Sequence, residues 1–132
     1  MSAENLYARA VFFVKDAERA LEFYRDRLGF SLDWRAPAEG RVWVFQMSLL
    51  GFELILNQEE PGREHRAGHG RVFIGLEEDQ IPPVRKHLED RAIETTLVDW
   101  GQSTTVIRDL DGNELYFWIL ESDQHVKLDV SR

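Results

Sequence analysis

Short apolar runs alternate with a segment of helical periodicity in the first half of the chain. Residues 7–14 are β-prone and predict a strand, after which Asp16 stands where a helix N-cap is expected. Apolar residues at helical spacing then predict a helix that ends at Gly29, a residue suited to left-handed backbone. Three further strands are expected over 30–34, 42–49 and 52–57. Gly51 between the last two predicts a β-hairpin, so the order is β-α-β-β-β.

A polar stretch over residues 58–69 predicts a linker, and the same order of elements begins again after it. A strand over 71–76 precedes a helix for which Asp79 is the expected cap, with two prolines in the first turn. The remaining strands are expected over 93–98, 104–108 and 114–120. Asp111-Gly112-Asn113 is a turn signal before the last strand, and residues 121–132 predict a polar tail.

Two features indicate that the second half of the chain repeats the first. Arg9 and Arg71 begin similar strand sequences and are 62 positions apart. Gly51 and Gly112, at the two expected hairpin turns, are 61 positions apart. Agreement within one residue favours an internal duplication.

The sequence therefore predicts one α+β domain over residues 1–132. Two tandem βαβββ modules, residues 7–57 and 70–120, are expected to form a curved mixed sheet with a concave cup and helices on its outer face. A chain of 132 residues with 43 % hydrophobic residues fits one domain and buries a core without crosslinks. The sequence has no cysteine, which excludes disulfides and thiolate metal sites.

Alternation of side chains along the strands sorts their residues onto two faces. One face is apolar throughout and holds Ala10, Phe12, Val14, Phe52, Leu54, Leu56, Val72, Ile74, Leu76, Leu115, Phe117 and Ile119. The other face mixes aromatic and charged residues and holds Arg9, Val11, Phe13, Glu53, Ile55, Asn57, Arg71, Phe73, Gly75, Glu114, Tyr116 and Trp118. We expect the apolar face to pack under the helices.

The mixed face has two interpretations. It is either a solvated sheet surface with Arg–Glu pairs across strands, or a concave ligand site whose apolar walls carry a few polar groups. Several aromatic residues together would be an unexplained apolar patch on a plain surface, which favours the ligand site. The candidate ligand-binding residues are Arg9, Phe13, Trp43, Phe45, Glu53, Arg71, Phe73, Glu114, Tyr116 and Trp118. Trp43 and Phe45 share one face of their strand, but alternation does not say which face.

Arg9 and Arg71 are related by the repeat, and we expect them to face each other across one cup. A buried arginine needs a partner, because an unpaired charge is strongly unfavourable. Each arginine either pairs with a neighbouring carboxylate, Glu53 or Glu114, or binds a carboxylate, phosphate or carbonyl oxygen of a ligand.

The paired modules, the stretch from Ala20 to Phe30 (ALEFYRDRLGF) and the turn from Asp109 to Asn113 (DLDGN) resemble the vicinal oxygen chelate superfamily. This family includes glyoxalase I, extradiol dioxygenases, fosfomycin-resistance transferases and bleomycin-resistance proteins. The likeness covers about residues 7–120. It implies a small-molecule site in the cup, which in the enzymes of the family holds a divalent metal ion through histidine, glutamine and glutamate side chains.

The positions that match those metal ligands carry Arg9, Arg71 and Tyr116, and the fourth falls on Glu53 or, with a register slip of two, on Ile55. Arginine has no lone pair to donate to a metal, and one carboxylate does not make a stable transition-metal site. We therefore expect neither a metal ion nor another cofactor.

Charge and composition narrow the class of partner. Sixteen Lys+Arg against 24 Asp+Glu give a net charge of -8, which argues against nucleic acid and suits either a cationic ligand or plain solubility. No apolar run approaches the roughly 20 residues that span a bilayer, and the N-terminus lacks the features of a signal peptide. Together with the absence of cysteine, this predicts a cytoplasmic protein without a membrane partner.

The leading hypothesis is metal-independent binding of a small organic molecule by a homodimer, for sequestration or resistance, in the style of the metal-free bleomycin-resistance-like members that the chain resembles. One alternative is a metal-dependent lyase, dioxygenase or transferase with an atypical ligand set that includes Glu53 and a histidine. Another is a cofactor-free enzyme in which Glu53 or Glu114 is a general base and Tyr116 or an arginine stabilises an oxyanion. The resemblance allows the modules to pair within a chain or to swap between chains.

Overall fold

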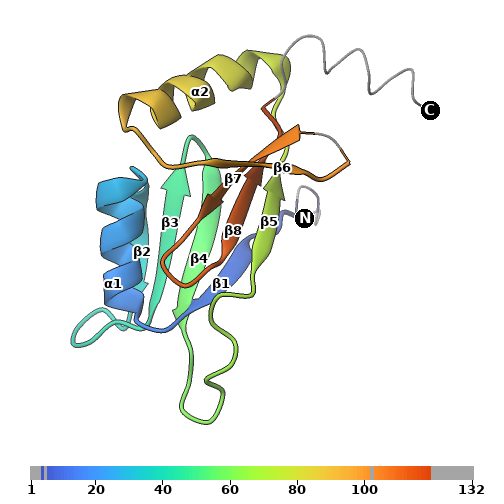
Figure 1. Cartoon of the computed structure of the whole chain (residues 1–132). Coiled ribbons are helices and arrows are strands. Elements are labelled where there is room, and N and C mark those ends of the chain that lie inside the picture. The colour runs from blue at the N-terminus through green and yellow to red at the C-terminus, as the bar shows by residue number, and fades with distance from the viewer. Residues whose placement is uncertain (1–3, 5, 102, 120–132) are drawn as a thin grey trace.

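The computed structural model of the chain describes residue 4, residues 6–101 and residues 103–119 (Figure 1). The first module contains β1 (Ala10–Val14), α1 (Ala17–Glu22), β2 (Ser31–Ala36), β3 (Val44–Leu49) and β4 (Phe52–Gln58). The second contains β5 (Arg71–Ile74), α2 (Ile81–Asp90), β6 (Thr96–Asp99), β7 (Ser103–Arg108) and β8 (Glu114–Phe117). The α+β class and the two βαβββ modules are thereby confirmed. The tail expected over 121–132 lies outside the described residues.

Local hydrogen bonds set the limits of the first helix as the sequence predicts. Asp16 caps α1, because its carboxylate accepts hydrogen bonds from the backbone N–H groups of Glu18 and Arg19. The helix continues as a π-helical turn over Phe23–Arg27 and ends at Gly29, whose φ of 81° is left-handed.

The start of the second helix differs from the prediction. Asp79 does not cap α2, since it lies inside a 3₁₀ turn over Glu78–Gln80 that precedes the helix. Glu77 caps this turn in a reciprocal arrangement with Gln80, whose side chain accepts from the Glu77 backbone. The two prolines do occupy the first turn of α2.

Each module forms its own four-stranded mixed sheet, with strand orders β1-β4-β3-β2 and β5-β8-β7-β6. In both sheets the first and last strands of the module run parallel, and the register places Ala10 opposite Leu54 and Val72 opposite Leu115. These two pairs are related by the offsets of 62 and 61 read from the sequence. Within the described residues, no strand pairing joins one sheet to the other.

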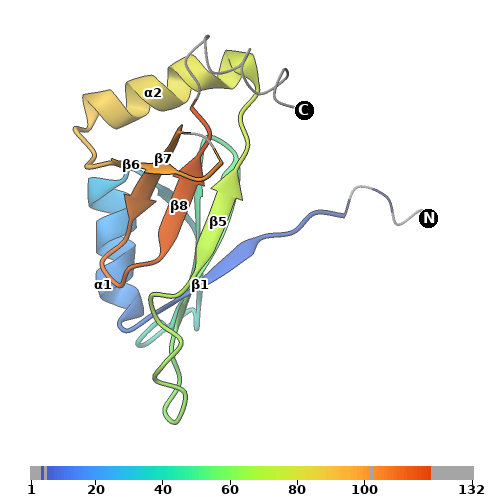
Figure 2. The same cartoon turned by 45° about the vertical axis from the view of Figure 1, so that its right-hand side comes forward.

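The apolar faces of both sheets meet in one hydrophobic core. Its buried members come from both modules and include Phe12, Tyr24, Leu28, Phe45, Met47, Leu54, Leu56, Val84, Leu88, Ile107, Leu115 and Phe117. Gly70 shows how closely the modules approach, because a Cβ atom there would lie 2.5 Å from Cδ1 of Phe12. Figure 2 shows β5 and β8 side by side, with β1 running below them, α2 crossing above the strands and α1 to their left. The helices in the described part of the chain are too short and too polar to span a bilayer.

This packing changes the expected relation between Arg9 and Arg71. Residues on the apolar face point into the shared core, so residues of the opposite parity point away from it. The mixed faces of the two sheets therefore lie on opposite sides of the core. Within one chain, Arg9 and Arg71 do not face each other across a cup.

Buried polar groups tie the turn before β8 to the first module. Asn113 is fully buried, and its side chain accepts from the Gly70 N–H at 2.8 Å and donates to the Phe13 carbonyl at 2.9 Å. The Tyr24 hydroxyl donates to Asp109 at 2.9 Å, and burial, with Asp109 second, raises the pKa of this phenol well above its usual range. The turn is thus fixed to both β1 and the end of the first helix.

We predict that Asn113→Ala lowers the free energy of unfolding by about 3 kcal/mol, because it leaves buried backbone groups at Gly70 and Phe13 without this partner. Asn57→Ala is the control, since among the described residues the Asn57 side chain bonds only the adjacent Gln58 carbonyl, and it is expected to cost under about 1 kcal/mol. Equilibrium urea unfolding measures both. Equal losses in the two variants would contradict the role given to Asn113.

Candidate functional site

Four aromatic rings gather on the mixed face of the second sheet, and we name this group the aromatic wall: Phe73, Trp100, Tyr116 and Trp118. Ring centroids are 5.3 Å apart for Phe73 and Trp100, 5.2 Å for Trp100 and Tyr116, and 5.7 Å for Phe73 and Trp118. Tyr116 is buried beneath the others, whereas Phe73 is 40 % and Trp100 46 % exposed. The wall is therefore a half-exposed apolar surface supported by a buried ring.

Charged side chains border the aromatic wall. The Arg71 guanidinium stands 4.4 Å from the centroid of the Tyr116 ring, within the range of a cation–π contact. Arg71 and Arg108 both pair with the Glu114 carboxylate, at 3.0 and 2.9 Å. Two guanidinium groups share one carboxylate, so this edge carries one uncompensated positive charge among the three groups.

The mixed face of the first sheet carries a chain of polar side chains, and we name it the polar network: Arg9, Asp33, Gln46, Ser48 and Glu53. The Arg9 Nε donates to Glu53 at 3.0 Å. The Gln46 Nε2 donates to Glu53 at 3.3 Å and to Asp33 at 3.1 Å. Ser48 donates to the other oxygen of Asp33 at 2.9 Å, and Arg9 also contacts Tyr7. This face is polar where the second sheet is aromatic.

The structure brings most of the predicted site residues onto the mixed faces. Phe73, Tyr116 and Trp118 form the aromatic wall. Arg9 pairs with Glu53, and Arg71 with Glu114, which is the first of the two alternatives left open by the sequence. Phe13 is half-buried on the first sheet under the Arg66 guanidinium, 4.9 Å from its ring centroid. Whether these residues bind a ligand stays a prediction.

Trp43 and Phe45 do not join these groups. Phe45 lies opposite Leu56 in the sheet and is 2 % exposed within the core, so its side chain is on the apolar face. Its burial removes it from the candidate site. Trp43 precedes β3 and is 48 % exposed.

Asp33, Gln46 and Trp100 were not among the sequence candidates. Gln46 did carry a signal, because it is a polar residue at an alternate position of the apolar run over 42–49. Trp100 follows β6 and reaches the aromatic wall from a loop. The alternation of side chains along strands does not predict where a loop residue points. Asp33 reaches Gln46 through a β-bulge between Leu32 and Trp34, and a bulge is not visible in a short polar and apolar pattern.

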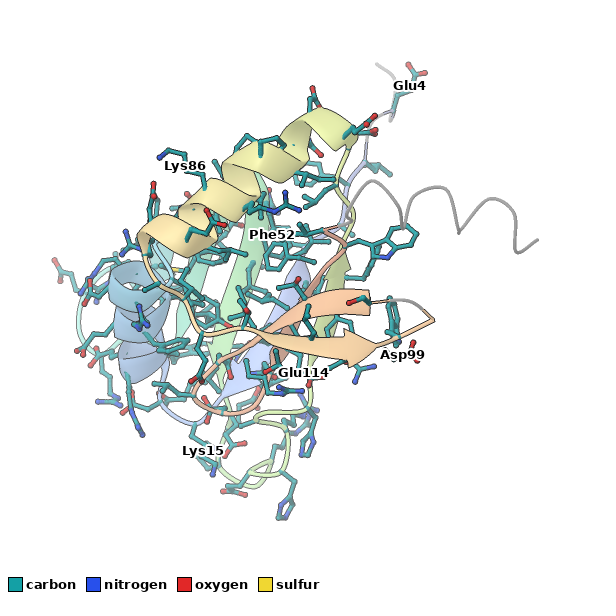
Figure 3. The ribbon with its side chains drawn as sticks, turned by 45° about the horizontal axis from the view of Figure 1, so that its top comes forward. Glu4, Lys15, Phe52, Lys86, Asp99 and Glu114 are labelled. Atoms are coloured by element: carbon teal, nitrogen blue, oxygen red, sulfur yellow. The ribbon has the colours of Figure 1, made fainter. Side chains whose placement is uncertain are left out.

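A separate hollow of about 510 Å³ lies between the modules, under α2. It is lined mainly by apolar residues that include Leu49, Phe52, Ile74, Pro83, Val84 and Phe117. Figure 3 shows Phe52 beneath α2, on the core side of the first sheet. No group of converging charges like that of the mixed faces lines this hollow, so it is the weaker candidate for a specific site.

The residues present do not fit a divalent metal site of the family's kind. Arg9, which precedes β1, forms an ion pair with Glu53, and Arg71 pairs with Glu114, which lies opposite it on β8, so each carboxylate is engaged by a guanidinium. Arginine donates hydrogen bonds and offers no lone pair. Across the described part of the chain, no three His, Asp or Glu side chains stand close enough together to hold a metal ion.

We predict that Glu114→Gln lowers the free energy of unfolding by about 1 kcal/mol, because Arg71 and Arg108 lose their shared counter-charge while remaining half-exposed. Salt at about 1 M should reduce this loss by screening the two arginines. Asp90→Asn, which removes an exposed partner of Lys86, is the control and should have no measurable effect. A loss for Glu114→Gln that does not respond to salt would argue against the charge explanation.

Comparisons with known proteins agree with this geometry. The family profile described as the Glyoxalase/Bleomycin resistance protein/Dioxygenase superfamily matches residues 7–117. Curated protein sequences gave no match. Three solved structures illustrate the range of similar folds.

The bleomycin-binding protein from bleomycin-producing Streptomyces verticillus, complexed with copper(II)-bleomycin, is 19 % identical over 91 % of this chain and 100 % of its own, with a TM-score of 0.66. Lactoylglutathione lyase from Agrobacterium tumefaciens is 17 % identical over 88 % and 94 %, with a TM-score of 0.56. The fosfomycin resistance protein FosX from Mesorhizobium loti is 10 % identical over 96 % and 99 %, with a TM-score of 0.55. At these identities the likeness shows the fold, and together with the profile match it establishes that the chain belongs to the glyoxalase/bleomycin resistance protein/dioxygenase superfamily.

Proposed function

We propose that the protein binds a small organic molecule with a flat ring against the aromatic wall, and that it does so without a metal ion. The observation that carries the proposal is the packing of four aromatic rings on a mixed sheet face, with Phe73 and Trp100 left about half exposed. Binding without reaction would make the protein one that sequesters its ligand or confers resistance to it.

The exposure of the wall is the first reason for this proposal. Apolar surface left in water costs about 25 cal/mol per Å², and contiguous apolar patches on a soluble protein are typical of binding sites. A flat ring laid on Trp100 and Phe73 would remove that surface from water and gain ring–ring contact. Arg71 at the margin supplies a donor that would orient a polar substituent of the ligand.

The ion pairs are the reason for proposing metal independence. The positions where metal-dependent relatives hold their ion carry Arg9 and Arg71, each bound to a glutamate. A relative in the superfamily, the bleomycin-binding protein, was solved with copper(II)-bleomycin bound to it, which is consistent with binding of an organic molecule as a function of this fold.

Closure of the site is the reason for proposing a homodimer. Within one chain the aromatic wall is open, because the polar network lies on the other side of the core. β1 and β5 are edge strands of their sheets, so a second copy could place its first sheet beside the second sheet of this one. The wall and the polar network of two chains would then line one cup.

We predict that 1-naphthylmethanol, a neutral flat probe, quenches the tryptophan fluorescence of the protein and that Trp100→Ala weakens its binding by about tenfold through loss of ring stacking. Trp43→Ala is the matched control, because Trp43 is equally exposed but lies off the wall. Fluorescence titration gives both dissociation constants. Equal affinity in Trp100→Ala and the parent protein, or equal loss in both variants, would remove the wall from the site.

Metal independence gives a second prediction. Purified protein should contain no stoichiometric Ni, Zn, Mn or Fe by elemental analysis, and added divalent metal or EDTA should leave both its melting temperature and its affinity for 1-naphthylmethanol unchanged, because a ligand that does not bind the native state cannot stabilise it. One tightly held metal ion per chain would contradict the proposal.

A further inference from the structure

The polar network contains a buried carbonyl oxygen that has no hydrogen-bond partner in the part of the chain that the structure describes. Gln46 is 3 % exposed, and its Nε2 donates to both Asp33 and Glu53. This assigns the amide orientation, because the opposite one would turn the oxygen toward two carboxylates. The Oε1 then has no hydrogen-bond partner among the described residues. An unsatisfied buried acceptor costs about 1–3 kcal/mol, so the site favours a donor from outside the chain.

The charge around Gln46 indicates what kind of donor fits. Glu53 has one oxygen on Arg9 and the other on the Gln46 amide. Asp33 accepts only neutral donors, Gln46 and Ser48, and within the described part of the chain it belongs to no ion pair. Two carboxylates are thus balanced by one guanidinium in this network. The remaining negative charge favours a cation.

A β-bulge gives the network its shape. The pairing of β2 with β3 shifts between Leu32, which lies opposite Met47, and Trp34, which lies opposite Gln46. Asp33 is the extra residue of this shift, and its carboxylate turns to the Gln46 side of the sheet. Trp34, 43 % exposed, therefore stands next to the network on the same face. An indole ring beside carboxylates is a favourable setting for an organic cation.

We propose that Asp33, Trp34, Gln46 and Glu53 form a subsite for a primary ammonium group. An ammonium carries three N–H donors and no acceptor, and the network offers it three acceptors: a carboxylate oxygen of Asp33, one of Glu53, and the Gln46 Oε1. The Trp34 ring would cover the alkyl carbon attached to the nitrogen. The inference rests on the proposed function, and on its homodimer in particular, because within one chain the polar network and the aromatic wall lie on opposite sides of the core. The subsite of one chain and the aromatic wall of its partner would hold the two ends of one ligand. The inference deepens the proposed function, since it assigns a charge to one of these ends.

An ammonium fits this network better than a bare metal cation. The described residues offer no cluster of three metal-ligating side chains here, and two of the available oxygens already accept hydrogen bonds from an amide nitrogen that would stand close to any bound cation. An ammonium group can bind beside the Gln46 Nε2, because each of its N–H groups donates a directed hydrogen bond to a separate oxygen.

The test compares two probes that share one ring system, 1-naphthylmethylamine and the neutral 1-naphthylmethanol, by titration at pH 7. We expect the amine to bind at least about tenfold more tightly, as charge-assisted hydrogen bonds would give. Asp33→Asn should abolish this preference, because the amine loses a charged acceptor and therefore loses more affinity than the neutral alcohol does. Asp33 is exposed, so the variant is expected to fold, and its melting curve checks this. Gln46→Leu should reduce the preference as well.

The control is Asp79→Asn, which removes the same charge from the turn before α2, outside the network. It should keep the full preference for the amine. Equal binding of both probes to the parent protein would overturn the ammonium subsite while leaving the proposed function intact. A preference that Asp79→Asn lowers as much as Asp33→Asn would also overturn it, as an effect of net charge. If neither probe binds, the proposed function fails together with the subsite.

Discussion

Each module has an apolar sheet face that one short helix cannot cover alone. The first helix brings only Ala17 and Ala20 as buried residues of α1, with Tyr24 and Leu28 following it, and the second brings Ile81, Val84 and Leu88. The two modules bury these apolar faces against each other in one core. The close approach of Gly70 to Phe12 and the buried Asn113 fix that packing. Because the apolar faces are joined, the mixed faces must point outward.

The outward faces of the two sheets differ in chemistry although the strand register within the two sheets is the same. Both carry an ion pair between an arginine at the start of the first strand and a glutamate on the last strand, Arg9 with Glu53 and Arg71 with Glu114. Two residues further along the last strand of each module the faces differ: Gln46 lies opposite Ile55 in the first sheet, and Val106 lies opposite Tyr116 in the second. The outward face of the first sheet is thus polar and that of the second is aromatic, so two sheets with the same strand arrangement present two chemically different surfaces.

Much of this fold follows from the sequence, because strand alternation and turn residues are local signals. Alternation sorts Phe12, Leu54, Leu115 and Phe117 onto the buried face, and the repeat fixes the pairing of the modules' strands. The relative orientation of the modules is set by long-range packing, which no local pattern encodes. For this reason alternation alone does not say whether Arg9 and Arg71 share one cup, and within one chain they lie on opposite sides of the core.

The candidate site is harder to predict from the sequence than the fold, because it also depends on contacts that local patterns do not encode. Phe45 is an aromatic residue of the kind that lines binding sites, but the register of β3 points its side chain into the core. Asp33 enters the polar network only through the bulge in β2, and Trp100 joins the wall from a loop. Single-residue shifts and loop paths decide these positions, whereas the residue types alone pointed only to a mixed aromatic and charged surface.

The central claim is that small molecules bind on an outward mixed face and not between the modules. A crystal structure of the protein soaked with 1-naphthylmethanol tests it most directly. The account predicts the naphthyl ring stacked on Trp100 and Phe73 of the aromatic wall. A ring found instead in the hollow under α2, against Phe52 and Pro83, would contradict it.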